Sequence, residues 1–528
     1  MKLNREILRL ALPSILANIT VPLVGMVDIA VVGHLGGAQA LSGAALIGGI
    51  SVGTMLFDLL YWNFGFLRAG TGGLTAQAYG RLRGLCPLLS PAAFSPSTSF
   101  SDGKSPGPGR APDGALLAYR AACSELVSIL GRALRIAVLS GLALFALQWV
   151  VVQGAFLVVD CSPEVRELAT RYFYIRIWAA PATLSLFALK GWYIGLQDTL
   201  RPMITDLWVN LCNILLSLGL GFGLTVGGSA AAGAGGAAEG GLTLLPAMGF
   251  TGVAWGTVIA QWTGLALALA MTRKYLSLKH FLKILVHFLN EDFQENADTQ
   301  ELTYHGAEGA STGKKAFYTL NRDLFLRSVG MIAVYIGFTV LSARLGDLML
   351  AVSTILMKLL MLFSYFTDGF AYAGEALTGR FIGERSPGGV RAAIRGTFAW
   401  SFGLAGLFML LYGLGGVPLF RLLTSDTSVI EAGKAFLPWL LLMPLVGCPA
   451  FAWDGIFVGA TASKQLRNST LLCAVGFFAV WFAGIWLLGP GSGNTRALHI
   501  LMAAYFTHLA IRTLYQTLCY RSAVLKKV

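Results

Sequence analysis

The hydrophobic positions of this chain fall into long runs that are separated by shorter polar segments. Each run holds about 20 or more mostly apolar residues, enough for a helix to cross about 30 Å of hydrocarbon at about 1.5 Å per residue. The runs predict twelve transmembrane helices, near residues 7–33, 44–68, 124–151, 166–188, 204–226, 248–272, 322–343, 347–372, 391–413, 433–458, 470–489 and 496–520.

Three polar segments interrupt the pattern and predict the domain organisation. Residues 84–118 are rich in Pro, Ser and Gly, and residues 227–241 are almost entirely Gly and Ala, so both predict loops without a packed core. Basic and apolar residues alternate at helical spacing early in the third segment, which predicts an amphipathic helix on the inner membrane surface, with a soluble helical cap as the alternative. We therefore expect an N-lobe of six spans (1–275), a cytoplasmic inter-lobe loop (276–321) and a C-lobe of six spans (322–528).

Composition agrees with a membrane protein. Hydrophobic residues make up 55% of the 528 positions and charged residues 12%, about half the share usual in soluble proteins. The first apolar run is too long for a cleavable signal peptide and lacks a small-residue cleavage site. The expected fold class is an all-α integral membrane protein.

The basic residues are placed asymmetrically and predict the orientation. With a cytoplasmic N-terminus, the inner loops and tails hold about 24 Lys and Arg and the outer loops about 5, which is the positive-inside bias. We expect a multi-pass protein of the plasma (inner) membrane with both termini in the cytoplasm. The net charge of +13 is thus a topology signal, and a nucleic-acid partner is not expected.

One carboxylate stands in the centre of the first run. Asp28 is the only charged side chain there, and a charge at the centre of the bilayer costs about 2.5–3.5 kcal/mol on insertion scales. Pro13 and Pro22 each remove a backbone donor from the same helix and predict hinges. A bendable helix with one titratable acid predicts a coupling element for transport, and a structural acid bonded to its neighbours is the alternative.

Further polar residues lie on two other spans and near the end of a third. Asn210, Asn213 and Ser217 share one face of the fifth span and predict either a proton or cation site or helix packing through asparagine. In the second half, the candidates for a cavity wall, with structural pairing left open, are Lys358, Asp368, Glu375 and Asp454.

Nothing in the sequence predicts an enzyme or a bound cofactor. The seven cysteines and six histidines show no spacing typical of a metal site, a disulfide framework or a catalytic set. A metal site is not expected, although Na⁺ near Asp28 stays open as the coupling ion.

The two halves of the chain are related. Gly65–Gly70 corresponds to Gly369–Gly374, and the Gly191-x-x-x-Gly195 spacing returns as Gly455-x-x-x-Gly459. Six spans per half give both repeats the same orientation, and repeated halves commonly enclose the substrate cavity between them.

The chain resembles multidrug and toxic compound extrusion (MATE) transporters. The similarity rests on the six-plus-six organisation, the opening P-x14-D-x4-G-x-L-G from Pro13 to Gly36, and the paired glycine segments. The segments Gly65–Gly80, Gly195–Met203, Ser342–Gly346 and Asp368–Gly379 resemble the DinF-like branch.

This resemblance implies two pseudo-symmetric six-helix bundles around a V-shaped cavity and the export of organic compounds in exchange for H⁺ or Na⁺. The family's first-helix acid corresponds to Asp28 and its hinge proline to Pro13. Ser217 stands where relatives often carry an Asp, so a site with two carboxylates in the N-lobe is not expected. Asp454 matches one acid of a sodium site in the NorM-like branch, but no acid near Met331 matches the other.

We therefore predict a secondary active exporter that moves organic, cationic or amphipathic compounds out of the cytoplasm in exchange for H⁺ through Asp28. The alternative is a flippase for a lipid-linked or amphipathic anion, motivated by Lys358, Arg68 and Arg327 within or near the spans. The expected partners are a small organic molecule and membrane lipid, and the expected oligomeric state is a monomer.

Overall fold

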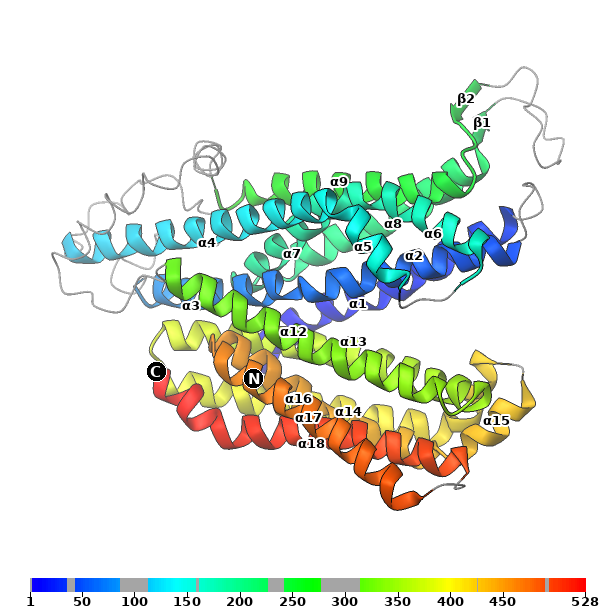
Figure 1. Ribbon diagram of the computed structural model, residues 1–528. Helices are drawn as coiled ribbons and strands as arrows, with labels where there is room; N and C mark the ends of the chain where they lie inside the picture. The colour runs from blue at the N-terminus through cyan, green and yellow to red at the C-terminus, as the bar shows by residue number, and fades with distance from the viewer. Residues whose placement is uncertain are drawn as a thin grey trace.

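The structure, a computed structural model, describes residues 2–35, 43–85, 113–157, 161–226, 242–276, 314–424, 426–489 and 493–528. Apart from one short β-hairpin, the regular elements of these residues are helices, and they form two bundles that lie side by side (Figure 1). Most of the three polar segments predicted as loops, including the expected amphipathic helix, lies outside the described residues.

The first bundle and its hairpin consist of α1 (Lys2–Leu35), α2 (Gly43–Asn63), α3 (Gly65–Leu85), α4 (Asp113–Ala146), α5 (Gln148–Ala155), α6 (Pro163–Arg176), the 3-10 turn η3 (Ile177–Ala179), α7 (Ala180–Gly195), α8 (Leu200–Phe222), β1 (Leu224–Val226), β2 (Leu242–Leu245) and α9 (Phe250–Thr272). The second bundle consists of α12 (Lys314–Ala343), α13 (Asp347–Gly383), α14 (Pro387–Leu423), α15 (Thr427–Lys434), α16 (Leu437–Gly459), α17 (Ser463–Leu488), α18 (Asn494–Ala523) and the turn η4 (Leu525–Lys527).

Twelve helical segments of the described chain are long and apolar enough to cross a membrane, six in each bundle. This confirms the predicted fold class. Each of the twelve predicted spans overlaps one of these segments, because a run of about 20 apolar residues can satisfy its backbone in hydrocarbon only as a helix or a closed barrel.

Several helix ends differ from the predicted bounds, and α13 continues to Gly383 instead of ending near residue 372. Helix α12 begins at Lys314, eight residues before the predicted start, because Phe317 and Leu320 of its first turns are buried in the core. Helix α4 already begins at Asp113, within the predicted loop 84–118. Helix α8 ends at Phe222, where Gly223 takes a φ of +82°, and β1 follows instead of more helix.

Helix α1 continues through both of its prolines. Pro13 and Pro22 lie inside an unbroken run from Lys2 to Leu35. Each proline removes one backbone hydrogen bond to the carbonyl four residues earlier, and the Thr199 hydroxyl donates to one of these freed carbonyls, that of Arg9, at 3.4 Å. The helix thus has one backbone bond fewer at each proline, and the hinges stay a prediction.

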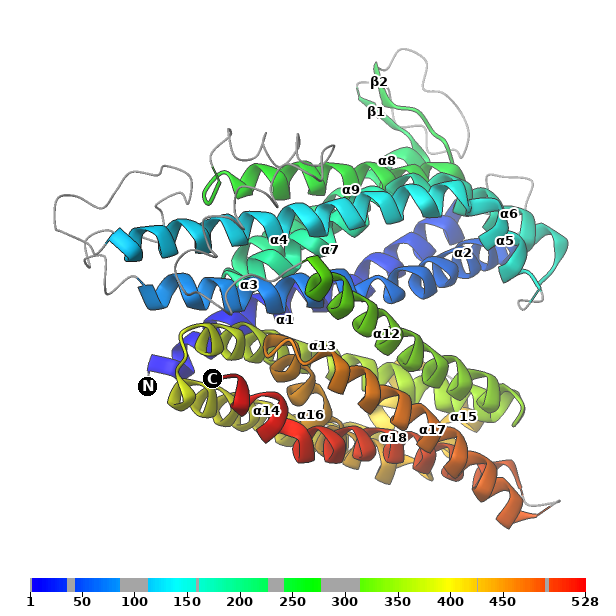
Figure 2. The same cartoon turned by 60° about the vertical axis from the view of Figure 1, so that its left-hand side comes forward.

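The two bundles touch mainly at one end of the molecule. Both chain termini lie at this end, here called the termini end, and β1, β2 and α15 lie at the other, the hairpin end (Figure 1). Ile7 and Ala11 from the first half of α1 are buried against Phe370 and Ala373 of α13. Towards the hairpin end the ribbons diverge in both views, which gives the molecule its V shape (Figures 1 and 2).

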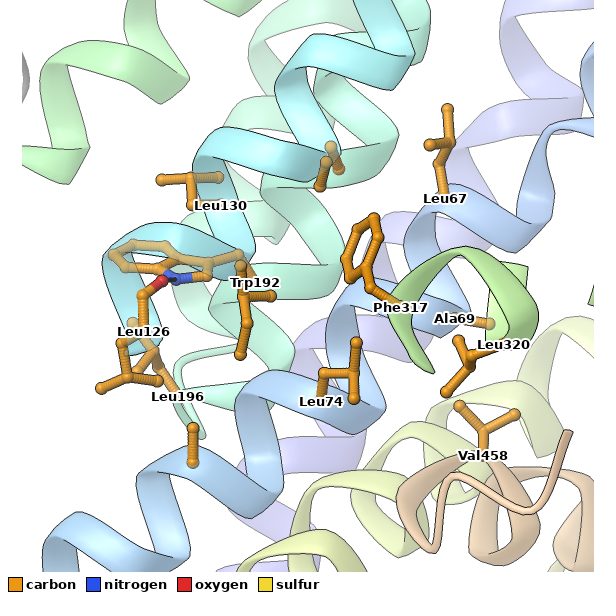
Figure 3. Close-up of a cluster of buried hydrophobic side chains, with 14 of the residues drawn as sticks. Leu67, Ala69, Leu74, Leu126, Leu130, Trp192, Leu196, Phe317, Leu320 and Val458 are labelled. Atoms are coloured by element: carbon orange, nitrogen blue, oxygen red, sulfur yellow. Dashed lines mark hydrogen bonds between the residues drawn. The ribbon is translucent and has the colours of Figure 1, made fainter. Parts of the chain in front are cut away.

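A core at the termini end ties the helices of the first bundle together (Figure 3). Trp192 of α7 is completely buried beside Leu126 and Leu130 of α4, and its indole Nε1 donates to the Leu126 carbonyl at 3.0 Å. Phe317 of α12 enters the same cluster from the second bundle. The core therefore spans helices that are far apart in the sequence.

We expect Trp192→Ala to lower the free energy of unfolding by roughly 3–5 kcal/mol, because it leaves a large cavity in this core. Thermal unfolding of the detergent-solubilised protein, followed by intrinsic fluorescence, measures the change. Trp486→Ala is the matched control, since this side chain on α17 is 81% exposed in the isolated chain. Equal shifts in both variants would contradict the packing argument.

Candidate functional site

Asp28 lies at the head of a chain of hydrogen bonds that joins three helices. Its carboxylate is 8% exposed and accepts from the Ser217 hydroxyl of α8 at 2.9 Å. The same hydroxyl lies 3.2 Å from Asn213 Oδ1, and Asn213 Nδ2 donates to Thr257 Oγ1 of α9 at 2.9 Å. The structure thus brings Asp28, Asn213 and Ser217 together, as the stripe on the fifth span predicted.

This chain of bonds can serve both protonation states of the acid. A hydroxyl has one proton and two lone pairs, so Ser217 donates to an ionised Asp28 and can accept from a protonated one. In the second case its own proton can turn to Asn213 Oδ1, which already lies within reach. The surroundings of Asp28 therefore tolerate the gain and loss of one proton without breaking up.

Asn210, which the sequence placed on the same helical face as Asn213 and Ser217, lies apart from Asp28. Its Nδ2 donates to the Thr20 hydroxyl of α1 at 2.6 Å, between the positions of Pro13 and Pro22. Asn210 thus ties α8 to the proline segment of α1, and in the described residues it forms no hydrogen bond to Asp28. Its geometry fits helix packing at the hinge better than ion binding.

Arg176 is a neighbour of Asp28 that the sequence did not single out as a site residue. It interacts electrostatically with Asp28 and with Asp58 of α2. Its guanidinium donates to the Tyr172 hydroxyl at 3.0 Å and lies over the ring of Phe57, 5.0 Å from the centroid. The sequence did contain a signal for Arg176, namely a basic residue among aromatic residues in an apolar span. Such a charge is tolerated in a membrane only beside a buried partner.

A second group of charges lies where the bundles meet. Arg68 of α3 forms an ion pair with Glu375 of α13 at 3.0 Å, across the two bundles. Arg68 motivated the flippase alternative as a charge within or near a span, and the structure gives it a buried carboxylate as its partner. Asp368, two turns before Glu375, interacts electrostatically with Arg68 and has no hydrogen bond to the described residues in this arrangement.

Lys190 and Asp206 form another ion pair, which lies inside the first bundle. Their charged atoms are 2.5 Å apart and both side chains are about a quarter exposed. Asp206 is therefore bonded to a lysine. The pair joins α7 to α8.

Asp454 of α16 is surrounded by donors. Arg512 of α18 donates through Nε to Oδ1 at 3.0 Å, and Gln516 donates to the same oxygen at 2.8 Å. Arg327 of α12 and the second arm of Arg512 bind Oδ2. Both oxygens are occupied and two guanidinium groups share one carboxylate, so the arrangement favours structural pairing, one of the two roles that the sequence left open.

Lys358 lies apart from these pairs. It is exposed on α13 in the isolated chain, and its interaction is electrostatic, with the exposed Asp58 of the other bundle. No ion pair within 4 Å joins Lys358 to any acid in the part of the chain that the structure describes. It can therefore attract a negative group between the bundles.

No cluster of three or more His, Cys, Asp or Glu that could hold a metal ion occurs in the described residues. A cation at Asp28 would have one carboxylate together with the oxygens of Ser217 and Asn213, beside the positive charge of Arg176.

Comparison with known proteins decides the family. The MatE family model matches residues 13–83, 123–218 and 324–482, which is more than half of the chain and includes both bundles. The chain belongs to the MATE family of multidrug and toxic compound efflux transporters. DNA damage-inducible protein F of Escherichia coli is 31% identical over 97% of this chain and 90% of its own length, which confirms the DinF-like branch. Protein DETOXIFICATION 42 of Arabidopsis thaliana is 23% identical over 63% of this chain and 60% of its own length.

Solved MATE structures share the fold. A Vibrio cholerae MATE transporter in the bent form aligns with a TM-score of 0.68 at 15% identity, over 100% of this chain and 98% of that one. A transporter of the MOP superfamily from Pyrococcus furiosus, described as having a binding pocket of reversed polarity, aligns at 0.67 and 16% identity over 100% and 97%. At these identities the likeness concerns the fold alone.

We expect Asp454→Ala to destabilise this MATE transporter by about 3–5 kcal/mol, because two guanidinium groups then remain buried without their counter-ion. The melting temperature in detergent measures the loss. Glu431→Ala, which breaks an exposed pair with Lys434, is the matched control and should change it little. A melting temperature of Asp454→Ala equal to that of the control would show that the cluster is not structural.

Proposed function

We propose that the protein is a proton-coupled exporter of organic compounds, with Asp28 as the group that carries the coupling proton. The observation that carries this proposal is the Asp28–Ser217–Asn213 chain of hydrogen bonds. It supplies a buried carboxyl with a partner that can switch between donor and acceptor. The other buried acids of the described chain, Asp323, Glu375 and Asp454, are bonded to arginines instead.

The choice of H⁺ over Na⁺ as the coupling ion follows from the same neighbourhood. A sodium ion replaces its hydration shell with several oxygen ligands and adds a full positive charge, whereas a proton needs one acceptor atom. Arg176 already interacts with Asp28 and opposes a second cation there. Protonation only neutralises the carboxylate and needs no further ligand.

The coupling step that we infer joins the proton to the shape of α1. Loss of the negative charge at Asp28 weakens its attraction to Arg176 and reverses its bond to Ser217. Helix α1 is weakly bonded at Pro13 and Pro22, so it can repack against α8 when that bond changes. Transport follows if substrate and proton have different affinities for the two arrangements of α1.

The substrate that we propose is organic and cationic or amphipathic. Aromatic side chains approach each other between the bundles, where the rings of Trp62 and Tyr335 meet edge to face with centroids 5.0 Å apart. The faces of such rings bind apolar and cationic groups. Residence in the plasma (inner) membrane with cytoplasmic termini and function as a monomer complete the proposal.

A flippase for an amphipathic anion remains the second candidate because of Lys358. Arg68 and Arg327, which also motivated it, are bonded to Glu375 and Asp454, so their charges are largely offset. Lys358 has no such close partner among the described residues. Competition between organic cations and amphipathic anions for transport separates the two functions.

The first test is efflux of a fluorescent organic cation from proteoliposomes, driven by a pH gradient or by a Na⁺ gradient. We expect efflux with the pH gradient alone and loss of at least tenfold of that rate in Asp28→Asn, because the amide cannot carry a proton. Glu431→Gln, far from the site, is the control and should keep the native rate. Unchanged pH-driven efflux in folded Asp28→Asn would refute the role of Asp28.

Ser217→Ala tests the hydrogen-bond chain with the acid left in place. Removing the hydroxyl withdraws the donor that stabilises ionised Asp28, so protonation should begin at higher external pH. We expect the pH profile of efflux to shift towards higher pH while some coupled transport survives. A profile identical to that of the native protein would show that the 2.9 Å bond does not tune the coupling group.

A further inference from the structure

Helices α3 and α13 cross at the termini end with their backbones almost in contact. A Cβ atom built on Gly80 of α3 would lie 2.1 Å from the carbonyl oxygen of Arg380, and one built on Gly383 of α13 would lie 2.1 Å from that of Gln77. Only glycine fits at either position. These two contacts come from opposite bundles and have the same geometry.

Each helix also sends a polar side chain into a turn of the opposite bundle. Gln77 of α3 donates through Nε2 to the Gly459 carbonyl at 3.0 Å and to the Thr461 hydroxyl at 3.2 Å, in the turn after α16. Arg380 of α13 donates to Gln197 Oε1 at 3.0 Å, in the turn after α7. The exchange is reciprocal.

The positions of the six residues show that this exchange is two-fold symmetric. Gln77 and Arg380 are 303 positions apart, as are Gly80 and Gly383, and Gln197 and Thr461 are separated by the same 264 positions as Gly195 and Gly459. The crossing of α3 and α13 therefore relates the two halves by a local two-fold axis. The offset between equivalent residues in this crossing differs by one residue from the offset between Gly65 and Gly369, which the sequence analysis matched.

Both turns that receive these side chains have a backbone that is rare for their residue types. Gln197 has a φ of +62° and Thr461 a φ of +51°, in the left-handed region. Such conformations persist where the surroundings hold them, and a β-branched residue such as threonine is especially disfavoured there. Lys527 of η4 donates to the Ala460 carbonyl at 2.7 Å and holds the second turn from its other side.

We propose that Gln77, Gly80, Gln197, Arg380, Gly383 and Thr461 form a reciprocal latch that keeps the termini end of the transporter shut. Because the two halves of the latch lie on either side of one crossing, the bundles cannot separate there without breaking both. An ion pair between Arg380 and Glu6 of α1, at 3.1 Å, adds the first helix to the same contact. The strength of the latch then sets how often this end opens.

The inference rests on the family's transport between two sides of a membrane and is independent of the role of Asp28. A carrier must open at each end in turn, and the free-energy difference between its two forms decides their populations. Contacts made only when the termini end is shut stabilise that form alone. The reciprocal latch consists of such contacts.

Hydrogen–deuterium exchange of the full chain in lipid nanodiscs tests the latch without substrate or ion gradient. Gln77→Ala removes two hydrogen bonds and adds no atom, and Arg380→Gln removes the charge from the other half. We expect exchange on the order of tenfold faster in residues 72–85, 194–200, 375–386 and 458–464 of either variant, with α15 at the hairpin end unchanged. Efflux in the Asp28 experiment can fail without affecting this result.

A glycine pair supplies the matched control. Gly80→Ala places a methyl group against the Arg380 carbonyl, whereas Gly403→Ala on α14 finds open space, with nothing within 4 Å of the added Cβ. Gly80→Ala should speed exchange at the termini end and Gly403→Ala should not. Native rates in both Gln77→Ala and Arg380→Gln would overturn the latch, and so would an equal rise at α15, which would indicate general destabilisation.

Discussion

The structure depends on one constraint, that a charge inside a hydrocarbon layer must find its partner within the protein. Hydrocarbon cannot solvate a charged group, and leaving a charge unpaired there costs several kcal/mol. The charges accordingly meet in pairs on faces between helices, as Arg68 does with Glu375 and Lys190 with Asp206. Helices that are remote in the sequence are thereby fixed to one another, in one case across the two bundles.

Asp28 and Asp454 show how the same residue type takes different roles under this constraint. Asp454 binds two guanidinium groups and an amide, and these contacts join α12, α16 and α18. Asp28 has a hydroxyl as its bonded partner, with Arg176 as a more distant charge. A hydroxyl can follow a change of protonation, whereas a pair of arginines opposes it. This difference is why the proposed coupling step belongs to α1.

The internal repeat produces equivalent contacts on the two sides of the interface between the bundles. In the sequence it appears as matched glycine spacings, Gly191 to Gly195 and Gly455 to Gly459. In the structure each of these segments ends in a left-handed turn that receives a side chain from the other bundle. Repeated halves of one orientation thus close against each other through equivalent residues, and one motif provides both sides of the proposed latch.

The sequence by itself determined the class of protein and the order of its spans, because the length of an apolar run has few structural solutions in a membrane. It also singled out Asp28, Asn213 and Ser217 as candidates, since a lone acid and a polar stripe stand out against apolar neighbours. It could not supply the partners of Asp454, Asp206 and Arg68, which come from other helices. Whether Asn210 faces Asp28 or Thr20, and whether Arg68 reaches water or Glu375, depends on how the helices are rotated and packed. That choice is made by contacts between distant segments, and only the tertiary structure contains them.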